Sequence, residues 1–244
     1  MQFPSLRAVF RIIIATLVVY LLFCAPISAD LIVDQHIDEL VSLASNGDKE
    51  KFVSYVKQQD LLNSADKDGH SPLFAAMFGP PELTNDMLEL GASLEHQDKL
   101  GFTPLISASL LGYPQAVDEL LKKGANIEAR NHDGQTALLI SVLGLAVNQG
   151  DTSAVADNRW HNNWQEVIAL LLRRGANVNT VDQRGVSPLF VAIFSQDYQL
   201  CRSLIGAGAN INHKLPNGVS LLRFAKVASS PAIVDLLVAN GAEL

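Results

Sequence analysis

The hydrophobic residues of this chain fall into short stripes at helical spacing, separated by polar turns that contain glycine. Within residues 101–133, Leu105 and Ala108 begin one apolar face, and Val117 and Leu120 belong to a second. A pair of helices this short cannot bury both of its faces alone. The pattern therefore predicts a helix-turn-helix unit that needs a copy of itself on each side.

The ends of the two predicted helices carry the residue types that start and stop helices. The Thr103 hydroxyl can accept an unpaired N–H at the start of the first helix, and Pro104 suits the position that follows. Tyr113 and Pro114 end the first helix and begin the second. Gly124 ends the second helix, because glycine adopts the left-handed conformation without a steric penalty.

Two series of glycines repeat in phase along the chain. Successive members of each series lie about 33 residues apart, except across the third unit, where both series show the same single excess. The shared excess indicates one insertion into an otherwise regular array. The turn glycines are Gly69, Gly101, Gly134, Gly185 and Gly218, and the helix-ending glycines are Gly91, Gly124, Gly175, Gly208 and Gly241.

A short motif opens each unit and, together with the period of about 33 residues, resembles the ankyrin repeat family. It reads Ser71-Pro72-Leu73, Thr103-Pro104-Leu105, Thr136-Ala137-Leu138, Ser187-Pro188-Leu189 and Ser220-Leu221-Leu222. The resemblance covers most of the chain after residue 30. It implies an all-α ankyrin-repeat solenoid of helix-turn-helix units with hairpin-like turns: about five repeats and an N-terminal capping helix pair.

The expected organisation is one elongated domain behind a leader. We expect a signal peptide at 1–29, a capping helix pair at 30–65, and repeats at about 66–97, 98–130, 131–181, 182–214 and 215–244, with an insert near 146–163 in the third repeat.

Residues 1–29 have the pattern of a secretory signal peptide. Arg7 and Arg11 give a positive start, residues 12–24 are apolar, and small residues up to Ala29 offer a cleavage site. An uncleaved membrane anchor is the alternative, but the apolar run is shorter than the roughly 20 residues that a spanning helix needs. We therefore predict export, to a bacterial periplasm or as a secreted protein.

Charge and cysteine content limit the partners and the chemistry. The net charge is −7, and removal of the two leader arginines would make it more negative, which disfavours nucleic acid and anionic membranes as partners. The processed chain would keep one cysteine, Cys201, so no internal disulfide is expected. Its place in a helical pattern favours packing as a small apolar residue over a redox role.

No arrangement of residues in the sequence indicates catalysis. The histidines form no H-x-x-x-H or H-E-x-x-H pair, no C-x-x-C is present, and the turn glycines are not followed by a phosphate-binding lysine. We expect no enzyme activity, no cofactor and no metal.

The resemblance to ankyrin proteins instead implies a concave face, built from hairpin tips and first helices, that holds another protein. Leu100, Phe102 and Leu110 stand out, because apolar residues near solvated turns suit an interface core. Packing against the next unit is the other interpretation. The candidate contact residues in the repeats are Lys99, Leu100, Phe102, Leu110, Leu111, His132, Asp133, Gln135, Gln183 and Arg184.

The insert offers a second candidate. Trp160 and Trp164 are the only tryptophans and lie four residues apart, so on a helix they would share a face. Two interpretations are open: a contact patch, since tryptophan is enriched in binding hot spots, or a small satellite core over the lengthened first helix.

These observations favour a non-enzymatic protein-binding module, monomeric in isolation and, once the leader is cleaved, not bound to a membrane. By analogy with other exported ankyrin-like proteins, the partner would be a toxin or enzyme that the chain inhibits, as an immunity-type protein does. The alternatives are a protective or structural factor for a periplasmic enzyme, and a secreted effector that binds host proteins.

Overall fold

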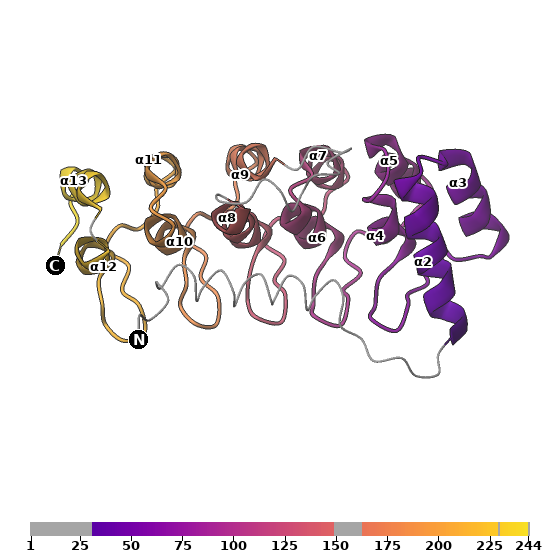
Figure 1. The fold of residues 1–244 in the computed structure, drawn as a ribbon, viewed down its shortest axis with the longest axis horizontal. Helices are drawn as coiled ribbons and strands as arrows, with labels where there is room; N and C mark the ends of the chain where they lie inside the picture. Colours follow the sequence, from indigo (N-terminus) through magenta and orange to yellow (C-terminus); the bar gives the residue numbers. More distant parts are fainter. Residues whose placement is uncertain (1–30, 149–162, 229, 244) are drawn as a thin grey trace, which may run out of the picture.

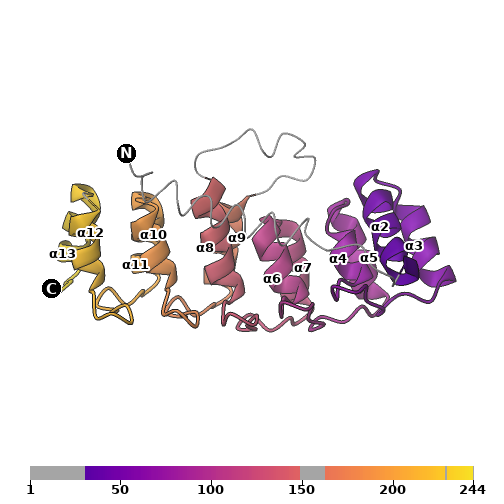
Figure 2. The ribbon, with the colours of Figure 1, turned by 60° about the horizontal axis from the view of Figure 1, so that its bottom comes forward.

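Paired helices stand side by side in one elongated row. The computed structural model describes residues 31–148, 163–228 and 230–243. Seen along the helices, the pairs form two layers, with α4, α6, α8, α10 and α12 in an inner layer and α5, α7, α9, α11 and α13 in an outer layer (Figure 1). The hairpin turns that join successive pairs all project from the same side (Figure 2). The chain is therefore a helical solenoid, as the glycine period predicts.

The helix bounds follow the predicted units. The first pair is α2 (Leu31–Ser45) and α3 (Lys49–Gln58), and the repeats hold α4 (Pro72–Ala76) and α5 (Pro81–Glu89), α6 (Pro104–Leu111) and α7 (Pro114–Lys122), α8 (Ala137–Asn148) and α9 (Trp164–Arg173), α10 (Pro188–Phe194) and α11 (Tyr198–Gly206), and α12 (Leu221–Val227) and α13 (Pro231–Ala239). The predicted signal peptide and most of the predicted insert lie outside the described residues. Within the described ranges, no helix is long and apolar enough to cross a membrane.

The helix ends confirm the local predictions. The Thr103 hydroxyl accepts a hydrogen bond from the Ile106 N–H at 3.3 Å, which satisfies one of the free donors at the start of α6. Gly124, after α7, has a φ of +94°, in the left-handed region that glycine adopts freely. α8 has 12 residues, against eight in α6, so the excess length of the third unit begins with an extra turn of its first helix.

The core runs as a continuous ribbon between the two layers. Leu105 and Ile106 of α6 and Leu138 and Leu139 of α8 are almost fully buried, because these inner helices have neighbours on three sides. Each unit contacts only its neighbours, so stability is roughly a sum of unit and interface terms.

Hydrogen bonds between hairpins form a ladder along the solenoid. A backbone N–H at each tip donates to a backbone carbonyl of the preceding tip: Lys99 to Asp68 at 2.9 Å, His132 to Leu100 at 3.0 Å, and Gln183 to Asp133 at 2.9 Å. The corresponding residue of the last hairpin is Pro216, which has no N–H to donate. This ladder therefore ends before the last unit.

A second ladder joins the turns that follow the outer helices. In each, a backbone N–H donates to a side-chain oxygen of the preceding unit: Ser93 to Asn63, Asn126 to Glu95, Asn177 to Glu128, Asn210 to Asn179, and Glu243 to Asn212. This ladder extends to the last unit.

Candidate protein-binding surface

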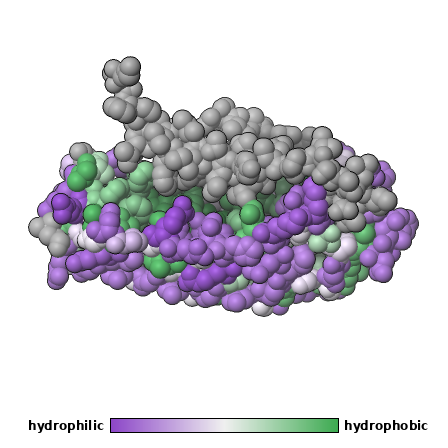
Figure 3. Space-filling view, turned by 90° about the horizontal axis from the view of Figure 1, so that it is seen from below, coloured by the Kyte–Doolittle hydropathy of each residue, from purple (hydrophilic) through white to green (hydrophobic). Residues whose placement is uncertain are grey.

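The hairpin tips present most of the predicted contact residues to solvent. We call the exposed tip residues of the three central hairpins the hairpin surface: Lys99, Leu100, His132, Asp133, Gln183 and Arg184. Seen from the hairpin side, the molecule is mostly hydrophilic, with isolated hydrophobic patches (Figure 3). The polar tips are bonded to one another; the Gln183 side-chain amide, for example, donates to the His132 carbonyl at 2.6 Å.

Leu100 is the apolar exception on the hairpin surface. Its side chain is 44% exposed, although the neighbouring tip residues are polar. It borders a shallow hollow of ≈ 40 Å³ with Phe74 of α4 and with Leu110 and Leu111 of α6. Both α6 leucines are partly buried, so the hollow is an apolar depression with one exposed edge.

Acidic groups and a histidine form the polar side of this hollow. The His70 ring stacks on Phe74, with centroids 4.4 Å apart, and its Nδ1–H donates to Asp66 Oδ2 at 3.1 Å. Burial alone would lower the pKa of His70, but the hydrogen bond to Asp66 and the carboxylates of Asp66, Asp98 and Asp68 outweigh it and raise that pKa.

The same bond lowers the pKa of Asp66. Burial works in the opposite direction, but the hydrogen bond and positive charge of His70, together with two backbone N–H donors, outweigh it. The hollow therefore combines apolar walls with Asp98 and His70 on its polar side, and Asp66 is bonded to His70.

Two predicted contact residues are buried, so their assignment to an exposed surface is wrong. Phe102 is 8% exposed and lies in the core, because the chain turns inward after Gly101: the Phe102 N–H donates to Asp98 Oδ1 at 2.8 Å. Gln135 is 5% exposed, and its Oε1 accepts a hydrogen bond from Asn131 Nδ2 at 2.9 Å inside its own hairpin. Gln135 therefore packs locally, whereas Phe102 packs in the core and also lines the hollow beside Leu100.

Trp164 also packs locally. As the first residue of α9, it places its indole between Gly112 and Gly144, where an added Cβ would lie 2.9 Å from Cδ2 of the ring and 2.7 Å from Cδ1 respectively. Its Nε1–H donates to the Leu110 carbonyl at 2.9 Å. The ring therefore covers the lengthened α8, as the satellite-core interpretation predicts. Trp160 lies outside the described residues.

The remaining reactive groups have structural surroundings. Cys201 is fully buried in α11, and burial raises the pKa of its thiol to about 12, so it packs as a small apolar residue. Across the residues that the structure describes, no group of three or more His, Cys, Asp or Glu side chains could hold a metal ion.

The structure brings together some predicted residues and adds others. Leu100, Phe102, Leu110 and Leu111 line one hollow, whereas His132, Asp133, Gln183 and Arg184 lie on later hairpins. Phe74 and Asp98 complete the hollow and were missed. Phe74 occupies the position at which the ankyrin signature has a histidine, and that departure was the available signal.

Comparison with known proteins agrees with this architecture. A model of ankyrin repeats in three copies matches residues 73–155. The B-cell lymphoma 3 protein homolog of Mus musculus is 36% identical over 80 residues, which are 32% of this chain and 18% of that protein. Rabankyrin-5 of Homo sapiens is 28% identical over 185 residues, covering 73% of this chain and 14% of that protein.

A bacterial relative matches over a similar length. The phosphocholine transferase AnkX of Legionella pneumophila is 24% identical over 180 residues, which are 73% of this chain and 18% of that protein. The chain thus spans less than a fifth of the length of these curated relatives. What they share with it is a repeat region within a much longer protein.

Two solved structures resemble the whole solenoid. An ankyrin repeat domain from Acinetobacter baumannii superposes with a TM-score of 0.68 at 25% identity, covering 84% of this chain and 98% of that one. The ankyrin repeat domain of Bcl-3 also gives 0.68, at 28% identity, covering 84% of this chain and 86% of that one.

Stacked helix pairs joined by hairpins, with one face of exposed tips, define the class of repeat proteins that act as protein–protein interaction modules. Within that class the chain has the ankyrin repeat fold, and residues 73–155 match the ankyrin repeat family. The ankyrin fold is typically a non-enzymatic binding scaffold.

Proposed function

We propose that the chain binds its partner protein through the hairpin surface, with an apolar side chain of the partner seated in the hollow beside Leu100. The exposure of Leu100 on an otherwise polar row of tips carries this proposal. Hot spots lie in well-packed pockets from which water is excluded, and an apolar depression becomes such a pocket when a partner's side chain fills it.

The charge around the hollow favours a particular partner chemistry. Asp66, Asp68 and Asp98 lie around His70 on one side, and Lys99 lies on the neighbouring tip. With His70 neutral, these three carboxylates exceed the two lysines of the tips, Lys67 and Lys99, so a lysine or arginine next to the partner's apolar side chain would be attracted. Because His70 gains positive charge as the pH falls, binding of such a partner would weaken in acid.

We further propose that the protein is exported and that the partner is a toxin or enzyme that it inhibits. The signal-peptide pattern of residues 1–29 supports export to the periplasm or the medium. Inhibition fits a surface that covers part of its partner, as an immunity-type protein would. A supporting factor for a periplasmic enzyme would bind without blocking catalysis, and a secreted effector would find its partner among host proteins.

The test of the binding surface is affinity capture with matched variants. Leu100→Asp should lower the affinity for the captured partner about tenfold, because burying the rest of this side chain is worth roughly 1–1.5 kcal/mol. Val238→Asp makes the same kind of change at an exposed apolar residue of α13, 54% exposed and far from the hairpins, and should have no effect.

The outcomes separate the parts of the proposal. Equal partner binding by the wild type and a folded Leu100→Asp variant would exclude the hairpin surface. Loss of the partner's activity on titration with the pure protein identifies an inhibitor, and unchanged activity identifies a supporting factor. N-terminal sequencing of the exported protein tests the leader, and a chain that still begins at Met1 would exclude cleavage.

A further inference from the structure

Ion pairs between units connect the outer helices in the middle of the solenoid. Lys123, just after α7, pairs with Glu89 of α5, and Arg174, just after α9, pairs with Asp118 of α7 at 2.5 Å. In both cases a cation directly before a helix-ending glycine reaches back to a carboxylate of the preceding outer helix.

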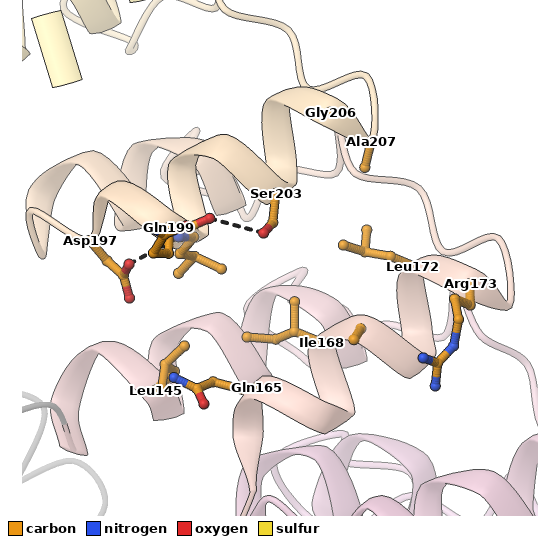
Figure 4. A pocket seen from close by; sticks show the side chains of 12 residues that line it. Leu145, Gln165, Ile168, Leu172, Arg173, Asp197, Gln199, Ser203, Gly206 and Ala207 are labelled. Carbon is orange, nitrogen blue, oxygen red and sulfur yellow. Dashed lines mark hydrogen bonds between the residues drawn. The ribbon is translucent and has the colours of Figure 1, made fainter. Parts of the chain in front are cut away.

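The interface between α9 and α11 has alanine at both positions that correspond to the Arg174–Asp118 ion pair. When the helix-ending glycines are aligned, Ala169 of α9 takes the place of Asp118, and Ala207, just after α11, takes the place of Arg174. A cleft of ≈ 560 Å³ lies there, and both alanines line it (Figure 4). Loss of the bridging side chains therefore leaves an opening between α9 and α11.

The cleft has an aliphatic floor. Leu145 from the extra turn of α8, Ile168 and Leu172 of α9, and Leu200 of α11 all line it, and none of the lining residues is aromatic. α9 and α11 have ten and nine residues, and at 1.5 Å per residue the cleft between them is about 14 Å long. The volume of the cleft lies in the range of small-molecule sites, roughly 300–1,000 Å³.

The two ends of the cleft differ in charge. Asp197 lies with Gln165 and Gln199 at the end where the helices begin, and Arg173 lies at the end where α9 finishes, so the carboxylate and the guanidinium mark opposite ends (Figure 4). Arg173 is exposed and, among the described residues, makes no ion pair, whereas its neighbour Arg174 is bound to Asp118. A guanidinium at the rim of an aliphatic groove is complementary to an anionic group on an alkyl chain.

We propose that the α9–α11 cleft binds a linear aliphatic carboxylate, with the alkyl chain along the leucine and isoleucine floor and the carboxylate paired with Arg173. Aliphatic walls without aromatic rings suit a flexible chain better than a planar ligand. The planar guanidinium can bind a carboxylate through two hydrogen bonds. The cleft lies between outer helices, away from the hairpins, so this site is independent of the proposed protein-binding surface.

Dodecanoate, below the concentration at which it forms micelles, is the probe. With alanine methyl groups labelled for NMR, the Ala169 and Ala207 signals should shift saturably. Arg173→Gln should weaken binding about tenfold through loss of the charged hydrogen bonds. Dodecyltrimethylammonium has the same chain and a cationic head, so it should bind to the wild type more weakly than dodecanoate does. Its affinity should increase in the Arg173→Gln variant.

A double variant that fills the cleft serves as the control without a binding site. Ala169→Asp with Ala207→Arg copies the ion pair of the preceding interface, so it should fold, fill the cleft and abolish dodecanoate binding. Leu100→Asp should leave dodecanoate binding unchanged, which separates this site from the hollow on the hairpin surface.

Three results would overturn the proposal. They are no saturable shift in the wild type, undiminished binding by the double variant, or equal affinity for both head groups. If dodecanoate fails to bind while the double variant loses the captured protein partner, the cleft is instead a protein contact.

Discussion

The position of Trp164 between two glycines leads to a prediction about Gly144→Ala. The effect of this substitution on the free energy of unfolding should change sign when Trp164 is also replaced. Gly144 lies inside α8, and a Cβ added there would lie 2.7 Å from Trp164 Cδ1 and closer still to Nε1. Real Cβ atoms do not approach a neighbour this closely, so Gly144→Ala must displace the indole. Displacement would break the hydrogen bond from Nε1 to the Leu110 carbonyl.

The expected magnitude follows from opposing terms. Alanine is better than glycine inside a helix by about 1 kcal/mol, which favours the variant. Against this stand a lost hydrogen bond, about 1 kcal/mol, and overpacking of a filled site, about 1–3 kcal/mol. We therefore expect Gly144→Ala to lower the free energy of unfolding by about 2 kcal/mol in the wild-type background.

Removal of the indole reverses the sign. In a Trp164→Ala background the space beside Gly144 is empty, and only the helix-propensity term is left, so Gly144→Ala should raise the free energy of unfolding by up to about 1 kcal/mol. The two backgrounds together give a coupling energy of about 3 kcal/mol, the upper end for residues in contact.

The measurement is urea unfolding of the four chains of the cycle, followed by far-UV circular dichroism. The slope with urea should be the same in all four, so the midpoints report stability alone. If Gly144→Ala stabilises both backgrounds equally, the indole of Trp164 does not pack between Gly112 and Gly144.

Three other substitutions or probes test the remaining packing and charge assignments. In a Cys24→Ser background, Cys201 should resist thiol reagents in the native state at mildly alkaline pH, since burial raises its pKa to about 12, and react fully in urea; rapid native labelling would contradict its burial. His70→Gln should cost about 1–2 kcal/mol near neutral pH. That difference should shrink as pH rises through the raised pKa of His70, because the native state then loses the proton that it holds more tightly than the unfolded state, and also as pH falls through the lowered pKa of Asp66. A pH-independent difference in urea midpoints would exclude the ion pair. Phe102→Ala should cost about 3–5 kcal/mol and Leu100→Ala under about 0.5 kcal/mol, and equal effects in thermal unfolding would contradict their opposite burial.

Local chemistry explains why so much of the fold could be predicted. A hydroxyl at Thr103 and a left-handed glycine at Gly124 act within a few residues, so their effects follow from the sequence alone. The helix starts and stops that these residues predict are confirmed for the same reason.

The orientation of individual side chains depends on the neighbouring unit and could not be read in this way. Leu100 and Phe102 flank the same turn glycine, yet one is exposed and the other buried, because hydrogen bonds to Asp98 and to the adjacent hairpin set the direction of the chain. The slot for Trp164 needs glycines from two different units, which no single-unit pattern reveals. The α9–α11 cleft could have been suggested by aligning the repeats, because alanine then stands at the positions of the ion pair between α7 and α9.

Pro216 weakens the attachment of the last helix pair to the rest of the solenoid. The hairpin ladder that binds each tip to the one before it stops at this proline, whose ring packs on Gly185 instead. The last pair, α12 and α13, is then held by packing against one neighbour and by side-chain hydrogen bonds, which join Gln196 to the Ala228 carbonyl and Asn212 to the turn after α13. Native-state hydrogen exchange should therefore be fastest in the amides of this terminal pair and slowest in α6 and α8, so the molecule frays from its C-terminal end inward.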